Sequence, residues 1–408
     1  RAEHVCEAVS ASGYRKGIVF SASHDDYGAS VGGVQNILSD ECIELNQRGV
    51  GHLHLCPVRP IRSLSPATEP ADFEFAVRLN GTALGRIDGR GLKDALRQLA
   101  QVGCKPYWVI HHLMGHSPEV IEQLVSTACE DVPLFWAHDF YAACTSYALM
   151  RNDVSFCHAP PLSSPACRVC VYGTERGEHA ARVRSLIHRV QPRIVAPSHN
   201  ALENWIRMTG ITPARSAVVH PARLCLTRER RPARSGPLRI GFIGQLVFHK
   251  GWDVFERLAH DFHRDERYKF FQLGRGSLAM PGFIRNIPVQ VSSTDRDAML
   301  RAVARHEIDA VVCWSLWPET FNFTVHEAIA GGAFVIARRE QGNVWPAAQA
   351  YAPQASKAVE DEAELHRYLQ SGQIIRDVDL SPRYRGAALP SMGSAELLAL
   401  NLEETAHA

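Results

Sequence analysis

The segment "PETFNFTVHEAIAGGAFVIA", residues 318–337, holds two glutamates in a sequence that is otherwise typical of a protein interior. The residues just before it, "DAVVCWS", are rich in β-branched and aromatic side chains and predict a buried strand. We predict a loop over "LWPETFN", a helix over "FTVHEAIA" that ends at Gly331 and Gly332, and a second strand over "AFVIA". Glu319 then lies in the loop at the carboxyl end of a strand, and Glu327 lies one to two turns into the helix.

The composition is that of a globular protein with balanced charge. The chain has 408 residues, 46% hydrophobic and 21% charged, which is enough for two or three domains with cores of their own. Its net charge is +1, so the overall balance gives no reason to expect nucleic acid as a partner. No apolar run reaches the roughly 18 residues of a membrane span, and no signal peptide pattern precedes the first strand. We therefore predict a cytoplasmic location.

Short apolar runs alternate with amphipathic segments along the chain, which is the pattern of a parallel α/β sheet. The predicted strands are "KGIVFSAS", "HLHLCPV", "PYWVIHH", "PLFWAHD" and "RIVAPS" in the first half, and "LRIGFIGQL", "YKFFQLG", "IDAVVCWS" and "AFVIA" in the second. The proline- and arginine-rich stretch "TRERRPARSGP" separates the halves. We predict a first domain over 1–226, a linker over 227–237, a second domain over 238–388 and a C-terminal helix over 389–408.

Ligands of such sheets bind at the carboxyl ends of the strands, where the loop with Glu319 lies. The chain contains neither GxGxxG nor GxxxxGK[ST], which disfavours ordinary dinucleotide and P-loop sites. The spacing from Glu319 to Glu327 corresponds to ~12 Å if it is helical, and to more if the loop is extended. This is the reach of a ligand with a sugar at one end, a ribose at the other and a diphosphate between them. The diphosphate would lie against the amides near Phe321, Asn322 and Phe323 at the start of the helix.

The same segment resembles the signature of retaining GT-B glycosyltransferases of the large family 4, which is close to PExFGxxxxEAMAxGxPVIA. The resemblance implies that Glu319 contacts the donor sugar and that Glu327 holds the ribose hydroxyls. The alternative is that Glu319 is a solvated loop residue and Glu327 a surface or capping glutamate.

A second segment, "GFIGQLVFHKGWDVF" from Gly241, resembles the G-R-L-x(3)-K-G loop of that family. The resemblance implies that this loop, with Gly244 and Lys250, binds the donor diphosphate. Lys250 is one of only six lysines in the chain, although a solvated loop charge is the simpler interpretation. Gln245 stands where the family usually has arginine and supplies no charge. The neighbouring "QLGRGS" contains Gly274 and Arg275, and Arg275 is a candidate to compensate.

The first half resembles the family more weakly. In "GASVGGVQNILSDECIELNQRG", Gly32 and Gly33 would allow close approach of the backbone to a ligand. "WVIHHLMGHSPEV" and "PLFWAHDFYAAC" resemble the paired histidine-containing strands of the acceptor domain. The resemblance implies that His138, followed by Asp139, faces the donor sugar, and it makes His111, His112 and His116 candidates for the acceptor site or cleft loop. The chain has 20 histidines, so the alternative is a set of hydrogen-bonded histidines at strand ends.

Four of the eleven cysteines follow the HD motif with the spacing C-x12-C-x9-C-x2-C, namely Cys144, Cys157, Cys167 and Cys170. Four thiolates in a short proline-rich stretch would suit a structural zinc ion. Reduced, scattered thiols and disulfides are the alternatives. The implied glycosyl transfer requires no cofactor.

Two further segments have a bearing on partners. The basic helix predicted over "ERGEHAARVRSLIHRVQPR", from Glu175 to Arg193, would suit contact with an anionic membrane that carries a lipid-linked acceptor. Packing of its apolar face within the domain is the alternative. The last predicted helix, "GSAELLALNLEET", corresponds in the family to a helix that crosses back onto the N-terminal domain.

The sequence therefore predicts a GT-B fold of two facing Rossmann-like domains. The predicted function is a retaining glycosyltransferase that moves a sugar from a nucleotide diphosphate to a glycan or lipid-linked glycan, in bacterial surface polysaccharide synthesis. The alternatives are a glycan-binding or scaffolding module without catalysis, suggested by Gln245, and another GT-B enzyme such as an epimerase or a phosphorylase.

Overall fold

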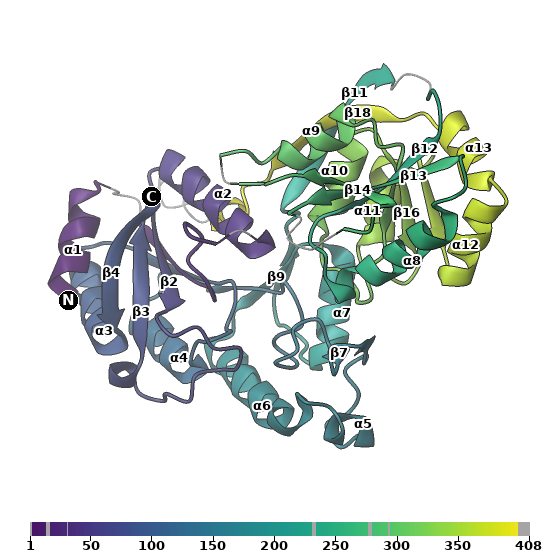
Figure 1. The fold of residues 1–408 in the computed structure, drawn as a ribbon. Coiled ribbons are helices and arrows are strands. Elements are labelled where there is room, and N and C mark those ends of the chain that lie inside the picture. The colour runs from purple at the N-terminus through teal and green to yellow at the C-terminus, as the bar shows by residue number, and fades with distance from the viewer. Residues whose placement is uncertain are drawn as a thin grey trace. The chain divides into compact units, whose positions relative to one another are not determined.

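The computed structural model describes residues 2–13, 17–30, 32–230, 234–275, 280–292 and 294–398. This part of the chain forms two compact units. Most of the N-terminal unit runs from purple to teal in Figure 1 and most of the C-terminal unit from teal through green to yellow, while the yellow residues from Ser391 onward belong to the N-terminal unit. The N-terminal unit takes the described residues up to Asn152, those from Cys157 to Pro221, and those from Ser391 onward, and the C-terminal unit takes the rest.

The unit boundaries differ from the predicted linker and C-terminal helix. The chain passes between the units at 152–153, 156–157, 221–222 and 390–391, whereas residues 227–230 of the predicted linker belong to a strand. Residues 231–233 lie outside the described part. At the C-terminal end, a strand runs to Pro390 and residues 394–398 are helical, so the helix begins later than predicted. Residues 399–408 of the predicted helix lie outside the described residues.

The N-terminal unit is built on a mostly parallel sheet. Its elements are α1 (Ala2–Ala11), β1 (Ile18–Ala22), α2 (Gly33–Gln47), β2 (Gly51–Pro57), η1 (Pro70–Asp72), β3 (Glu74–Leu79), β4 (Thr82–Asp88), α3 (Gly89–Gln101), β5 (Pro106–Ile110), α4 (Pro118–Thr127), β6 (Leu134–Trp136), α5 (Pro165–Arg168), α6 (Gly173–Val190), β9 (Arg193–Ala196), α7 (His199–Thr209) and β10 (Ser216–Val218). The described strands are ordered β10-β9-β6-β5-β1-β2-β3-β4. Strands β7 (Met150–Arg151) and β8 (Ser155–Phe156) form a separate two-stranded sheet, and β8 lies among residues 153–156, which are grouped with the C-terminal unit.

All five strands predicted in the first half are present, and β1 lies between β5 and β2. From β1 the chain continues to β2 on one side and returns to β5 on the other, so the strand order reverses between β1 and β5. Such sheets bind ligands beyond the carboxyl ends of the strands at this point of reversal. The antiparallel hairpin β3–β4 was not predicted. Its turn, Asn80-Gly81, has φ angles of 49° and 86°, as a type I′ turn requires.

The C-terminal unit is a second, fully parallel sheet. Its elements are β12 (Leu238–Ile243), η2 (Phe248–Lys250), α8 (Trp252–Phe262), β13 (Tyr268–Gly274), β14 (Ile284–Pro288), α9 (Ala298–Arg305), β15 (Ala310–Cys313), α10 (Phe323–Ala330), β16 (Phe334–Arg338), α11 (Val344–Tyr351), β17 (Ser356–Val359), α12 (Glu362–Gln370) and α13 (Gln373–Leu380). The described strands are ordered β14-β13-β12-β15-β16-β17. Helix α10 has the bounds predicted from "FTVHEAIA".

Helices cover both faces of this sheet, as in a doubly wound fold. On one face α8, α12 and α13 bury residues such as Phe255, Leu369 and Val378 against the strands. On the other face α9, α10 and α11 contribute a second apolar cluster that includes Val303 and Val325 (Figure 1). Because both faces are covered, polar chemistry is left to the two ends of the strands. We call these ends the amino edge and the carboxyl edge of the sheet.

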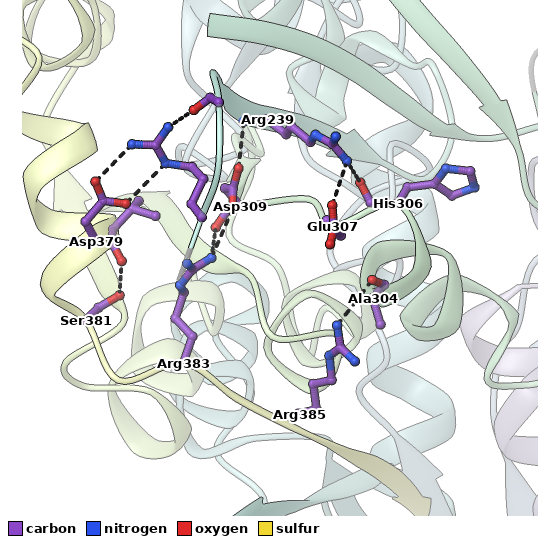
Figure 2. A network of polar contacts seen from close by, with 12 residues as sticks. Arg239, Ala304, His306, Glu307, Asp309, Asp379, Ser381, Arg383 and Arg385 are labelled. Carbon is purple, nitrogen blue, oxygen red and sulfur yellow. Dashed lines mark hydrogen bonds and ion pairs between the residues drawn. The ribbon is translucent and has the colours of Figure 1, made fainter. Parts of the chain in front are cut away.

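The amino edge of this sheet carries a structural ion-pair network. The ribbon of β11 (Ala222–Arg230) and β18 (Tyr384–Pro390) pairs antiparallel, and Arg383 directly precedes it. Figure 2 shows Asp309, buried just before β15, accepting hydrogen bonds from the Arg239 amide at 2.9 Å and from the Arg383 guanidinium at 3.4 Å. Burial lowers the pKa of Arg383, and the nearby Asp309 opposes this effect. The network fixes the ribbon to the sheet at the edge opposite the predicted ligand loops.

Candidate functional site

The loops after β12 and β13 approach each other through two glycines. Gly244 and Gly274 have φ angles of 108° and 153°, a region that favours glycine. A Cβ atom on Gly274 would lie 2.4 Å from the Gly244 carbonyl oxygen. These two predicted positions are therefore explained by close backbone packing at the carboxyl edge of the sheet.

Lys250 and Glu319, predicted from separate motifs, meet in the structure. The Lys250 Nζ lies 2.5 Å from Glu319 Oε1, and the Ser315 hydroxyl donates to the same oxygen at 2.7 Å. The Glu319 residue is only 4% exposed, whereas the Lys250 side chain is 37% exposed and lies 5.5 Å from the centre of the Trp317 ring. A buried carboxylate next to a partly exposed ammonium is suited to a ligand that has hydroxyls and negative charge. Sequence reasoning missed Ser315 and Trp317.

The backbone of Glu319 is held by the loop after β16. Its amide donates to the Gln341 carbonyl at 3.2 Å, and the Asn343 amide donates to its carbonyl at 2.8 Å. Gly342, at φ 67°, fits between them, because a Cβ atom there would lie 2.3 Å from the Glu319 carbonyl oxygen. The position of the Glu319 carboxylate is thus fixed from three loops.

The start of α10 is capped by Asn322. This residue has φ 70°, and its Oδ1 accepts the Val325 amide at 2.9 Å. Phe321 is buried and stacks on His326 with ring centroids 4.3 Å apart, and Phe323 contacts Phe321 edge to face. The three residues predicted near the diphosphate thus lie at the helix N-terminus, where the amides favour an anion.

Glu327 lies partly buried within α10, as predicted. Burial, with a smaller contribution from the charge of Asp297, raises the pKa of its carboxyl to about 8. Within the described part of the chain no group donates a hydrogen bond to this carboxyl. Since polar groups away from solvent are normally hydrogen-bonded, this carboxyl is suited to form hydrogen bonds with hydroxyl groups of a ligand.

Gln245 and Arg275 both lie exposed beside these loops, at the ends of β12 and β13. No hydrogen bond or ion pair links either side chain to Lys250 or Glu319 among the described residues. Compensation of Gln245 by Arg275 therefore stays a prediction.

In the N-terminal unit, His111 and His138 lie side by side after β5 and β6. The His111 Nδ1 lies 3.0 Å from His138 Nε2, and the His111 Nε2 lies 3.0 Å from Glu41 Oε2. Glu41 and His111 are buried, and His138 is 9% exposed. Burial lowers the pKa of His138 well below its ordinary range, so the ring is neutral. Sequence reasoning missed Glu41, whose buried carboxylate contacts the His111 ring.

His112 and Asp139 form a second pair in the same unit. The Met114 amide donates to His112 Nδ1 at 3.0 Å, and His112 Nε2 donates to Asp139 Oδ2 at 2.9 Å. His116 is fully buried and bonds the Ser23 carbonyl at 2.7 Å, and burial lowers its pKa to about 4. These contacts fit hydrogen-bonded histidines at strand ends and leave a ligand role as a prediction.

The predicted glycines of the first loop lie at the start of α2. Gly32 is the N-cap residue with an extended backbone, and Gly33 is the first helical residue. A Cβ atom on Gly32 would lie 2.5 Å from Gln35 Oε1. The buried Gln35 side chain in turn donates to His24 Nε2 at 3.2 Å. A side chain at position 32 would therefore have to displace the end of the Gln35 side chain.

The four cysteines predicted to bind zinc do not form a ligand set in this structure. Among the described residues, no group of three or more His, Cys, Asp or Glu side chains is arranged to hold a metal ion. The Arg176 guanidinium donates to Cys167 Sγ at 2.9 Å, and burial raises the pKa of Cys144 and of Cys157, which opposes thiolate formation. All eleven cysteines of the sequence are free thiols.

The basic helix predicted to contact a membrane is α6. Its Arg182 forms two hydrogen bonds with Glu119 at 2.8 and 2.7 Å, and Arg189 pairs with Glu122 at 3.1 Å. Arg176, in the first turn of the same helix, is buried. These arginines are engaged within the N-terminal unit, which favours the packing alternative. None of the described helices is both long and apolar enough to span a membrane.

No protein-family model and no curated protein sequence matches the chain. Among solved structures, sucrose-phosphate synthase from Thermosynechococcus elongatus is similar, with a TM-score of 0.56 and 13% identity over 96% of this chain and 98% of that one. WaaG, a glycosyltransferase involved in lipopolysaccharide biosynthesis, has a TM-score of 0.51 and 11% identity over 89% and 92%. Anabaena Alr3699/HepE in complex with UDP-glucose has a TM-score of 0.50 and 11% identity over 96% and 99%.

The chain has the GT-B fold. These neighbours are GT-B proteins of two Rossmann-like domains, and the likeness covers almost the whole of both chains. The predicted fold class is confirmed. At 13% identity or less the likeness extends to the fold, so the chemistry has to be argued from the side chains.

Proposed function

We propose that this protein is a glycosyltransferase that uses a nucleotide-diphosphate sugar as donor. The observation that carries the proposal is the Lys250–Glu319 pair, with Nζ and Oε1 2.5 Å apart, at the carboxyl edge of the C-terminal sheet. This edge is where doubly wound sheets bind their ligands. The pair joins the two segments that resemble family 4 in sequence, although they are 69 residues apart.

The donor would lie across the loops at the carboxyl edge, with its sugar at Glu319 and its ribose at Glu327. Lys250 and the first amides of α10 would neutralise the diphosphate. Glu319 would accept hydrogen bonds from hydroxyl groups of the sugar, and Glu327 would accept hydrogen bonds from the ribose hydroxyls. Because the HepE structure holds UDP-glucose, UDP-sugars are the first donors to try.

We further propose that the reaction retains the anomeric configuration. The bond from the anomeric carbon to the diphosphate oxygen breaks, and the acceptor oxygen attacks the same face. The acceptor's proton passes to the departing diphosphate, which Lys250 and the helix amides stabilise. Glu319 serves the sugar hydroxyls and is not proposed as a nucleophile, and His138 is proposed to hydrogen-bond the sugar.

The acceptor is proposed to be a glycan or lipid-linked glycan of a bacterial surface polysaccharide, bound by the N-terminal unit. A cytoplasmic location and peripheral contact with a membrane belong to the same proposal. The reaction as written needs no metal or other cofactor.

Calorimetric titration with UDP, GDP and ADP tests the donor site. We expect one of them to bind, and we expect Lys250→Ala to weaken its binding by about 1–3 kcal/mol, the range for charge-assisted hydrogen bonds. Lys269→Ala, which removes an exposed lysine on β13 of the same unit, is the matched control and should leave binding unchanged. No heat with any nucleotide would favour the binding-module alternative.

The stereochemistry is tested on the product. Proton NMR of fresh product from the accepted donor should show the donor's anomeric configuration preserved. An inverted product would exclude the front-face mechanism and leave the donor site intact.

A further inference from the structure

A continuous chain of hydrogen bonds leads from the main chain near the C-terminus to His138. The Ser394 amide donates to Glu41 Oε1 at 2.6 Å, Glu41 Oε2 contacts His111 Nε2 at 3.0 Å, and His111 Nδ1 contacts His138 Nε2 at 3.0 Å. Glu41, His111 and Ser394 are 0 to 1% exposed. The chain of contacts therefore runs through the interior and reaches the surface only at His138.

The His111 and His138 rings are also nearly parallel, with an interplanar angle of 9°. The Trp136 ring stacks on His138 with centroids 4.8 Å apart and an interplanar angle of 7°, and on His111 at 5.9 Å and 12°. The Trp136 indole nitrogen donates to the Ser394 hydroxyl at 2.7 Å. Ser394 thus anchors both the carboxylate and the aromatic platform.

The main chain passes close to the Glu41 side chain at Gly393. Gly393 has φ 56°, and a Cβ atom there would lie 2.6 Å from Glu41 Oε1. The next residues, Ala395 and Leu398, pack into the core of the N-terminal unit. Only a glycine at 393 allows the chain to pass Glu41 this closely.

These contacts determine where the protons lie. A carboxylate only accepts hydrogen bonds, so the proton between Glu41 and His111 belongs to His111 Nε2. When His111 carries a single proton, its Nδ1 is an acceptor, and the proton between the two rings belongs to His138 Nε2. His138 Nδ1 then carries no proton, and this nitrogen is an acceptor.

We propose that Glu41 and His111 are positioning residues that fix the tautomer and the ring plane of His138. The significance for catalysis rests on the proposed function, in which His138 contacts the donor sugar. In the tautomer set by Glu41, His138 accepts a hydrogen bond at Nδ1, so it would recognise a sugar hydroxyl as a donor. An invariant tautomer removes the need to reorganise the ring when the ligand arrives.

NMR of protein labelled with ¹⁵N-histidine tests the proton assignment without any substrate. The spectrum should show His111 and His138 each with a protonated Nε2 and an unprotonated Nδ1, the two rings being identified from the signals lost in His111→Gln and His138→Gln. A doubly protonated His111, or a proton on His138 Nδ1, would overturn the proposal. This test does not depend on the protein being a glycosyltransferase.

Glu41→Gln tests the positioning role. The glutamine carbonyl can accept the Ser394 amide, so its NH₂ group must face His111 Nε2. His111 then has to carry its proton on Nδ1, and His138 on Nδ1 as well, so both tautomers invert. We expect turnover with an accepted donor sugar to fall at least about tenfold while KM changes little.

Glu119→Gln is the matched control, since it removes a carboxylate of the same unit that pairs with Arg182 and does not contact the histidines. It should leave both the tautomers and turnover unchanged. Inverted tautomers with wild-type turnover in Glu41→Gln would refute the positioning role. If no donor supports turnover in the wild type, the proposed function fails while the proton assignment is still decided by NMR.

Discussion

The two units organise polar side chains in different ways. In the N-terminal unit the candidate histidines are buried at the ends of strands and hydrogen-bonded to side chains, as His111 is to Glu41, or to the main chain, as His116 is to Ser23. In the C-terminal unit the candidates lie on loops, where glycines such as Gly274 and Gly342 let the backbone pack closely around Glu319. The first arrangement depends on burial of neutral rings, and the second on backbone geometry around a charged pair. The two units should therefore respond to pH and to substitution in different ways.

The largest expected difference is in stability against acid. Burial lowers the pKa of His24 and His54 to about 3, and of His116 and His179 to about 4. A histidine with a lowered pKa contributes its stability above the unfolded pKa near 6.5, and this contribution is lost as pH falls toward the folded value. Each one costs roughly 2 kcal/mol between pH 6.5 and 5. We expect the N-terminal unit to unfold first as pH is lowered from 6.5 to about 4.

In the C-terminal unit, Glu327 makes the pH dependence of stability run in the opposite direction. Its folded pKa of about 8 lies above the usual value of 4.5, so the folded state holds a proton in this range that the unfolded state does not. Its stability contribution is therefore greatest below pH 4.5 and is lost as pH rises toward 8. Hydrogen exchange of peptides from β2 and β5, compared with peptides from β12 and β15, measures the two units separately. Equal acid sensitivity of both sets of peptides would contradict the comparison.

The second largest effect concerns the charged pair in the C-terminal unit. Glu319→Gln keeps an acceptor for Ser315 but removes the charge that pairs with Lys250. If the carboxylate serves the donor sugar in the transition state, turnover should fall by about 100-fold or more. Thermal unfolding of the variant shows whether the fold is intact. Glu340→Gln, on the exposed loop after β16, is the control, and full activity of Glu319→Gln would remove Glu319 from the site.

A smaller effect is expected from the protonation of Glu327. With a pKa of about 8, its carboxyl is mostly protonated at pH 7. If the ribose hydroxyls bind the carboxylate form, nucleotide binding should release close to one proton and tighten about tenfold from pH 6 to pH 7. Titration calorimetry in buffers of different ionisation enthalpy measures the proton count. Glu327→Gln should abolish the release, and a release that persists in this variant would come from another group.

The same contrast between the units explains what the sequence could predict. The strand–loop–helix segment around Glu319 is contiguous, so its apolar pattern and two glycines predict each element, and α10 runs from Phe323 to Ala330 as expected. The alternation of apolar runs likewise predicts the parallel sheets of both units. Packing of the Lys250 loop against the Glu319 loop follows once β12 and β15 are adjacent strands.

The histidine network could not be predicted in this way, because its members are far apart in the sequence. Glu41 and His111 are 70 residues apart, and Glu41 and Ser394 are 353 residues apart. The signal that was available is the position of Glu41 on the apolar face of α2, between Leu38 and Leu45. An acidic residue in that position predicts a buried partner without saying which one. Asn80-Gly81 in the β3–β4 hairpin is a similar local signal, since Asn-Gly is typical of a type I′ turn.

The smallest predicted effect concerns Gln245, where the family usually has arginine. Gln245 is exposed at the end of β12, so a charge placed there is screened by solvent and should contribute about 0.5–1 kcal/mol to diphosphate binding. Gln245→Arg should therefore tighten nucleotide-diphosphate binding by roughly two- to fivefold at low salt, and the gain should shrink when ionic strength rises. Gln245→Ala, measured alongside, should change affinity less, because the glutamine contributes no charge. If Arg275 already compensates, Arg275→Ala should weaken binding, and Gln245→Arg should restore it in the double variant. An arginine at 245 that leaves affinity unchanged at every salt concentration would place the diphosphate away from the β12 loop and would leave Glu319 and Glu327 without the ligand that is proposed to join them.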